Sequence, residues 1–222
     1  MKENAGLWEY IAGLFDGEGC IGTIPVSVNE RKASMRTSTG LSLHGVRYAA
    51  GFFDAEGCLH TIPCKMQSGN FIVKNFLGFN IVLEKLCLLA IKKYCKKWGI
   101  KRVYMTVSKP SQYHRRLVYT LRINGKQDVC KFLKLIRPYS ILKRPQIDIY
   151  LNEIAPKLKI GKKGGRYSPN YTKLEFLELM RSVDRLNSLK CKCRGKYNTN
   201  YFRRLWGYRE KRIVDKRYQM GG

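Results

Sequence analysis

Two acidic residues follow a helix-like segment in the N-terminal part of the chain, and their types and spacing could support metal chemistry. The segment 48–57 reads YAAGFFDAEG and contains Asp54 and Glu56. Gly51 and Ala55 are four residues apart, so they share one helix face and let another backbone come close. The acids lie at the negative end of the helix dipole, where a cation must compensate them. The segment therefore predicts a carboxylate site for a hard divalent ion, Mg²⁺ or Mn²⁺.

The same segment occurs once before, as residues 10–19 with the sequence YIAGLFDGEG. The two copies are offset by 38 residues, and Glu18 takes the place of Glu56. The repeat continues into the residues after each segment, so the repeated unit is predicted to be a helix followed by a hairpin. We expect Gly57 to end the second helix in the left-handed conformation.

Both copies resemble the signature helix of the LAGLIDADG homing endonucleases, a family of site-specific DNA-cleaving enzymes. In that family an acid at the eighth motif position binds metal at the scissile phosphate, and this position is Glu18 in the first copy and Glu56 in the second. The resemblance thus implies Glu56 and Glu18 as metal ligands. The alternative is a tight helix–helix contact whose acids only cap a turn.

Charge points to a nucleic-acid partner. Among 222 residues, 43 are Lys or Arg and 16 are Asp or Glu, which gives a formal net charge of +27. Such an excess attracts phosphate backbones, although a basic solvated surface without a ligand is the alternative. The eight cysteines match no zinc-binding pattern. No apolar run approaches the length that spans a bilayer, so no membrane partner is expected and an intracellular location is predicted.

From residue 46 onwards, the hydrophobic pattern predicts helix, two strands, helix, two strands and helix. The strands are expected at 58–65, 71–82, 102–109 and 115–123. This order resembles one half-unit of the LAGLIDADG fold, which implies an α+β, αββαββα saddle with a four-stranded antiparallel sheet and C-terminal helices. We divide the chain into three parts: the duplicated motif helix and hairpin (1–45), the endonuclease core (46–190) and a basic C-terminal extension (191–222).

The resemblance also suggests roles for further residues. Segment 138–143 resembles the part of the family that carries the active-site lysine, so Lys143 would stabilise charge or polarise water. Asp54 is grouped with the catalytic residues Glu56 and Lys143, and we interpret it as supporting the helix interface or the site. Segment 176–187 resembles a C-terminal helix of homodimeric members that carry one motif per chain.

Basic residues on or near the predicted strands, and in the basic loop 157–170, are candidates for DNA contact because Arg and Lys bind phosphates and guanine edges. The candidate DNA-binding residues are Lys65, Gln67, Asn70, Lys74, Arg102, Lys109, Gln112, Arg115, Arg116, Arg122, Lys162, Lys163 and Arg166, with Asn75 as a further base reader. The aromatic and basic tail 190–218 could contact the DNA backbone or pack on the core.

The extra N-terminal copy is expected to be an appendage. A hairpin that folds back on itself would leave residues 43–46 too short to bring the second helix alongside the first. The second copy would then pair with its twin in another subunit, giving a homodimer. In that arrangement deletion of residues 1–44 would leave an active dimer, and Glu18→Gln would be nearly silent.

The sequence therefore predicts a divalent-metal-dependent, site-specific endonuclease of double-stranded DNA. Two alternatives on the same scaffold stay open: a maturase that binds its own intron RNA, and a DNA-binding protein that does not cleave. They are favoured by Leu83 and Cys87, which fall where related enzymes carry polar residues. If the gene lies in an organelle intron, we expect the protein in the chloroplast or mitochondrion.

Overall fold

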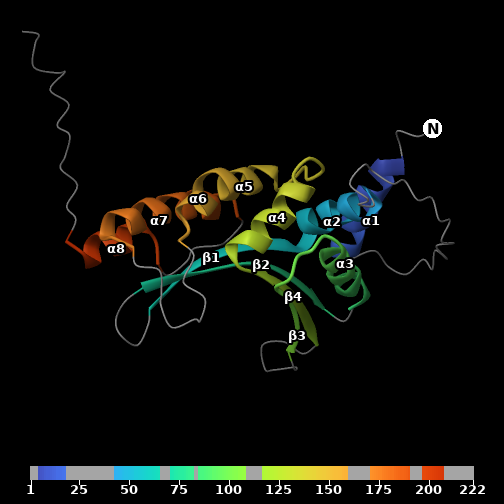
Figure 1. Cartoon of the computed structure of the whole chain (residues 1–222), viewed down its shortest axis with the longest axis horizontal. Helices are drawn as coiled ribbons and strands as arrows, with labels where there is room; N and C mark the ends of the chain where they lie inside the picture. Colours follow the sequence, from blue (N-terminus) through green and yellow to red (C-terminus); the bar gives the residue numbers. More distant parts are fainter. Residues whose placement is uncertain are drawn as a thin grey trace, which may run out of the picture.

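A four-stranded antiparallel sheet, covered on one face by helices, is the centre of the computed structural model (Figure 1). The structure describes residues 5–18, 43–65, 71–82, 85–108, 117–159, 171–190 and 197–207. Two helices come first, α1 (Ala5–Glu18) and α2 (Leu43–Glu56), and α2 leads directly into the sheet. Within the described residues, no helix is long and apolar enough to cross a membrane.

The strands are β1 (Gly57–Lys65), β2 (Phe71–Val82), β3 (Val103–Ser108) and β4 (Val118–Asn124), in the spatial order β1-β2-β4-β3. Helix α3 (Leu86–Lys97) follows β2, and α4 (Lys126–Ile136) follows β4. The αββαββ order predicted from residue 46 onwards is confirmed, and so is the α+β class. The second helix begins at Leu43, slightly earlier than expected.

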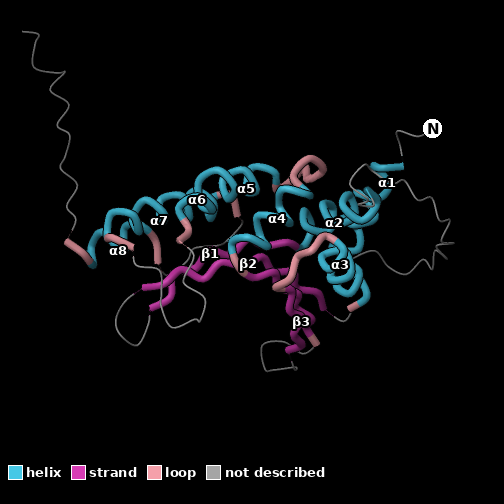
Figure 2. Tube along the Cα trace, in the orientation of Figure 1, coloured by secondary structure: helices cyan, strands magenta, loops and turns pink. Residues whose placement is uncertain are grey.

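A run of helices continues after α4 along the covered side of the sheet, as Figure 2 shows in cyan. It comprises α5 (Arg144–Ile149), a π-helical turn η1 (Tyr150–Ile154), α6 (Ala155–Lys157), α7 (Lys173–Ser188) and α8 (Thr199–Leu205). Helix α7 begins with a capping box, in which Thr172 and Glu175 bind each other's backbone N–H. Its buried residues recur every three or four positions, as an amphipathic helix requires.

Aromatic side chains fill the core between the helices and the sheet. Phe79 of β2 lies 5.5 Å from Phe52 of α2 and 5.9 Å from Phe132 of α4, measured between ring centroids. At the far end, Phe202 of α8 is fully buried and lies 4.8 Å from Phe176 of α7. The part of the tail that the structure describes thus packs on the core, which was one of the two interpretations of its aromatic residues.

Odd-numbered and even-numbered strand residues lie on opposite faces of the sheet. In β1 the odd-numbered residues from Gly57 to Pro63 are buried, whereas Ile62 is exposed. The register pairs odd with odd and even with even residues across all three strand pairs, for example His60 with Phe76 and Gly78 with Arg122. All even-numbered strand residues therefore share one face, which we call the open face, and the odd-numbered residues face the helices.

Candidate active site and nucleic-acid interface

Helices α1 and α2 pack against each other through their glycines. A Cβ atom on Gly13 would lie 2.1 Å from the carbonyl oxygen of Tyr48, and one on Gly51 would lie 2.0 Å from that of Tyr10. Neither distance is sterically possible, so only glycine permits this approach. The contacts repeat with the 38-residue offset of the sequence, which makes the pair symmetric about a local two-fold axis.

The prediction that the two motif helices of one chain cannot pair is therefore wrong. The error lay in treating residues 19–42 as a hairpin that returns the chain to the end of α1. Those residues lie outside the described part of the structure, and their length permits the observed placement of α2. In this structure α1 occupies the face of α2 that was expected to receive a second subunit.

Asp54 is a buried hub for hydrogen bonds. Its side chain is 3% exposed, and its two oxygens accept five hydrogen bonds. The hydroxyls of Tyr10 and Ser140 donate at 2.7 and 2.5 Å. The backbone N–H groups of residues 141, 142 and 143 donate at 2.6, 3.1 and 3.0 Å. This carboxylate holds α1 and the segment before α5 in place, so it positions the site and does not face a substrate.

Lys143 closes the C-terminal end of α2. Its ammonium group donates to the carbonyl oxygens of Phe53, Ala55 and Gly57 at 3.1, 2.9 and 2.8 Å. It also lies 5.6 Å from the centroid of the Phe53 ring. The positive charge offsets the negative end of the helix dipole. The sequence had predicted that a cation would compensate this end of the helix. Because Ala55 and Gly57 flank Glu56, the structure brings the predicted acid and the predicted lysine to the same helix end.

Contact with the Phe53 ring, and not a left-handed backbone conformation, accounts for the glycine after Glu56. Gly57 is absent from the positive-φ glycines of the described chain, so the expected left-handed helix end is not found. A Cβ atom on Gly57 would lie 2.1 Å from the Phe53 ring, which is why glycine is required. Helix α2 therefore runs straight into β1, and partly exposed Glu56 stands at this junction.

The second predicted metal ligand lies at the equivalent end of α1. Helix α1 ends at Glu18 and α2 ends at Glu56, and both acids follow their contact glycine by five residues. The side chain of Glu18 is outside the described part of the structure. Within the described part, no cluster of three or more His, Cys, Asp or Glu residues could hold a metal ion. One or two carboxylates fit Mg²⁺ only if phosphate oxygens complete its ligands, which is how Mg²⁺ is commonly bound at phosphate sites.

Some predicted DNA-binding residues lie on the open face. Lys74 of β2 and Arg122 of β4 are exposed there, and Arg102 is exposed just before β3. Lys65 has the parity of the helix-covered face, although its place at the end of β1 leaves it exposed. The remaining predicted contacts lie outside the described residues: Gln67, Asn70, Lys109, Gln112, Arg115, Arg116, Lys162, Lys163 and Arg166.

Asn75 was predicted to read bases, and this is wrong. It faces the helices, where its amide donates to the Tyr150 hydroxyl at 2.6 Å. Thr61, its cross-strand partner, donates to its side-chain oxygen at 3.5 Å. Asn75 has an odd number in β2, and odd-numbered strand residues face the helices. The prediction was wrong because this alternation of faces was not applied to Asn75.

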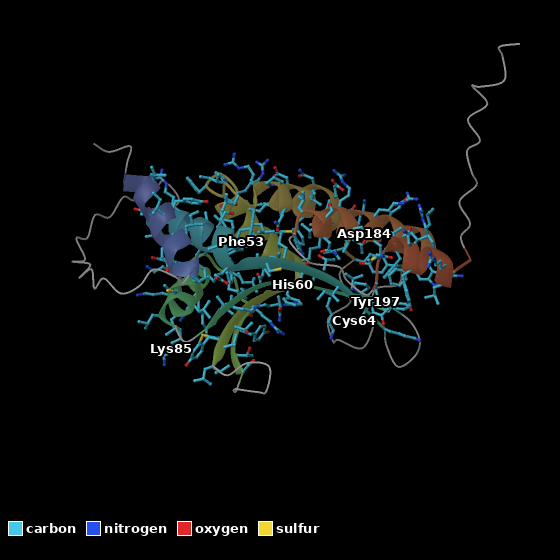
Figure 3. All side chains as sticks on the ribbon, turned by 180° about the vertical axis from the view of Figure 1, so that it is seen from behind. Phe53, His60, Cys64, Lys85, Asp184 and Tyr197 are labelled. Carbon is cyan, nitrogen blue, oxygen red and sulfur yellow. The ribbon has the colours of Figure 1, made fainter. Side chains whose placement is uncertain are left out.

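A stack of side chains on the open face was missed by the sequence reasoning. The ring of His60 lies 4.5 Å from that of Phe76 with 17° between their planes, and the Arg122 guanidinium lies 5.2 Å from the Phe76 centroid. Figure 3 labels His60 on β1 between Phe53 and Cys64. Burial, then the charges of Lys190 and Arg122, lower the pKa of His60 to about 4. The residue is therefore neutral near pH 7. The even parity of all three residues is the signal that could have found this stack.

Lys190 anchors the end of α7 to the outer edge of the sheet. Its ammonium donates to the carbonyl oxygen of Leu59 and, at 3.1 Å, to the side chain of Asn187.

Cys87 takes a position at which related enzymes were expected to carry a polar residue. It is partly buried in the first turn of α3 and packs on the core. Leu83 lies outside the described residues.

The fold is similar to that of DNA-bound homing endonucleases. One solved relative is the homing endonuclease I-CvuI in complex with a DNA target, with a TM-score of 0.57 and 21% identity over 74% of this chain and 93% of that chain. Another is the archaeal intron-encoded homing endonuclease I-Vdi141I complexed with DNA, with a TM-score of 0.52 and 20% identity over 71% and 91% of the two chains. No family model and no curated protein sequence matches the chain. The chain has the fold of the LAGLIDADG homing endonucleases.

Proposed function

We propose that this protein is a site-specific endonuclease that hydrolyses double-stranded DNA with the help of a divalent metal ion. The observation that carries the proposal is the convergence of Glu56 and Lys143 at the end of α2, where that helix enters the sheet. The open face presents basic and aromatic side chains beside this point. The DNA complexes of the similar folds support duplex DNA as the partner.

The residues of the site divide the chemical work between them. Mg²⁺ or Mn²⁺, held by Glu56 and DNA phosphates, would supply charge neutralisation and an activated water. Lys143 offsets the negative charge at the C-terminal end of α2, which lessens the repulsion of a phosphodiester that approaches Glu56. Asp54 fixes the backbone that carries Lys143 and so maintains the spacing between lysine and acid. The I-CvuI complexes were obtained in the presence of Mg or Ca, which agrees with a divalent ion.

The second acid of the site is supplied by the same chain. Because α1 and α2 are paired symmetrically, their C-terminal ends are equivalent at the level of the backbone. In this proposal Glu18 acts together with Glu56. The proposal differs from the expectation that Glu18→Gln is nearly silent, and the homodimer stays a prediction.

Cleavage of a defined duplex tests the proposal. The substrate is DNA that carries the intronless form of the gene's own insertion site, incubated with the full chain and either Mg²⁺ or EDTA. We expect both strands to be cut at one position only when Mg²⁺ is present. Tight, sequence-specific binding without cutting would favour the non-cleaving alternative, which the apolar setting of Cys87 supports.

A further inference from the structure

The two asparagines of β2 lie on opposite faces of the sheet and use their amides differently. Asn75 faces the helices, and its amide nitrogen donates to the Tyr150 hydroxyl. Asn80 has an even number, so it lies on the open face, where it is exposed. Among the described residues, its side chain makes one hydrogen bond, and this bond uses the oxygen. The amide nitrogen of Asn80 is therefore available to a ligand on the open face.

Thr120 fixes the orientation of the Asn80 amide. It lies opposite Asn80 on β4, and its hydroxyl donates to Oδ1 of Asn80 at 2.8 Å. Thr120 is 8% exposed, so its O–H group has little access to water. Rotation of the amide by 180° would remove the acceptor of this group among the described residues, and a buried donor without an acceptor is costly. The oxygen of Asn80 is therefore held towards the sheet, and its NH₂ group is presented outwards.

An asparagine held in this way offers donors to a base edge and withholds its acceptor. In the major groove guanine presents two acceptors, N7 and O6, whereas adenine presents the N7 acceptor and the N6 donor. An unconstrained asparagine pairs with adenine, because its oxygen accepts from N6 while its nitrogen donates to N7. Thr120 engages that oxygen in this protein, so the Asn80 amide matches guanine better than adenine.

The surroundings of Asn80 favour the same base. None of the four strands contains Asp or Glu within its described bounds, so the strands offer no carboxylate to accept from the N4 group of cytosine. Arg122, whose guanidinium lies over the Phe76 ring on the same face, has only donors to offer. Donors on this face require acceptors on the base edges, and guanine is the base that presents two of them.

We propose that Asn80 reads one guanine in the major groove of the DNA target, and that Thr120 is the positioning residue that makes Asn80 select guanine over adenine. The inference rests on the proposed recognition of duplex DNA and adds to it the identity of one base. Neither residue is among the contacts that the sequence predicted. Thr120 acts through the amide and does not itself touch the base.

Selection of bound duplexes from a randomised DNA library tests the proposal, because it gives the base preference of the full chain at each position. EDTA is present throughout, so cleavage plays no part. We expect the wild type to select guanine at one base pair, and Asn80→Ala to lose the preference there. Thr120→Val removes the hydroxyl at nearly constant volume, so the amide can turn. The preference for guanine over adenine at that base pair should then fall from about tenfold to about equal.

Two further variants and a modified base separate this role from a structural one. Thr120→Ser keeps the hydroxyl and should keep the preference for guanine. Thr106 lies opposite Thr120 in the next strand and does not bind Asn80, so Thr106→Val should leave that base pair unchanged. Replacing the selected guanine by 7-deazaguanine removes N7, which should weaken binding by the wild type and leave binding by Asn80→Ala unchanged.

The possible outcomes distinguish this inference from the proposed function. The inference alone is overturned if the wild type selects a sequence but Asn80→Ala changes the preference at no base pair, or at one where the base is not guanine. It is also overturned if Thr120→Val selects as the wild type does. A wild type that selects no sequence contradicts the proposed function and this inference together.

Discussion

The hydroxyl of Tyr10 donates a hydrogen bond of 2.7 Å to Oδ2 of Asp54, across 44 positions of the chain. Burial, reinforced by the carboxylate, raises the pKa of Tyr10 well above its ordinary value, so the phenol stays protonated as a donor. The same carboxylate binds the backbone before α5. One buried charge thus ties the N-terminal repeat to the segment that carries Lys143.

Tyr10→Phe removes this donor and keeps the ring. We expect a loss of about 1–2 kcal/mol in the free energy of unfolding, since a hydrogen bond to a charged acceptor is lost while four other donors remain on Asp54. Urea denaturation measures the loss. The exposed Tyr104 provides the control Tyr104→Phe, which should leave stability unchanged. Equal effects of the two changes would contradict the hub role of Asp54.

Glu56→Gln and Glu18→Gln should each abolish cleavage and leave DNA affinity within a few-fold. The reason is that both acids stand at symmetric helix ends, whereas binding rests on dispersed Lys and Arg side chains. Single-turnover cleavage at saturating Mg²⁺, paired with a binding assay, measures the two effects separately. Glu178→Gln, on the exposed side of α7, is the control. Full activity of Glu18→Gln would show that the N-terminal copy lies outside the site.

Lys143→Ala should slow cleavage strongly with little loss of binding. The change also leaves three carbonyl oxygens at the end of α2 without their donor, so stability should fall by about 1–3 kcal/mol. Lys74→Ala, on the open face, should show the opposite pattern of weaker binding and unchanged stability. If the two variants lose binding and cleavage in the same proportion, Lys143 is only another phosphate contact.

DNA binding should depend steeply on salt. A net charge of +27 and a basic open face make about 6–10 phosphate contacts reasonable, which would lower affinity roughly 10³–10⁵-fold between 50 and 200 mM salt. A titration of log affinity against log salt concentration measures the slope. A nearly flat line would argue against an extended duplex footprint.

His60 should make stability fall as the solution becomes acidic. Its pKa is about 4 in the folded protein against an ordinary value of 6.5, so between these values the unfolded chain binds a proton that the folded protein excludes. The free energy of unfolding therefore decreases as pH falls from 6.5 towards 4, and His60 contributes no such change above 6.5. His60→Gln should flatten the curve between pH 6.5 and 5, measured by denaturation. Identical slopes would mean that His60 stays in water with its ordinary pKa.

Regular patterns in the sequence predicted most of the fold. The bounds of β2 were predicted at 71–82 because turn residues at 66–70 precede a mostly apolar stretch, and the structure has Phe71–Val82. The prediction failed for α1, where it relied on an assumed path for residues 19–42. It also failed for Asn75, because the alternation of faces along β2 was not applied to that residue. The cap formed by Lys143 joins residues about 90 positions apart, and only a resemblance pointed to that lysine.

The described part of the chain forms one sheet, and a single open face limits how much sequence one particle can recognise. Each base pair that is left unread increases the number of matching sites in a genome about fourfold. A particle with one open face would therefore find many more acceptable sites than a particle with two.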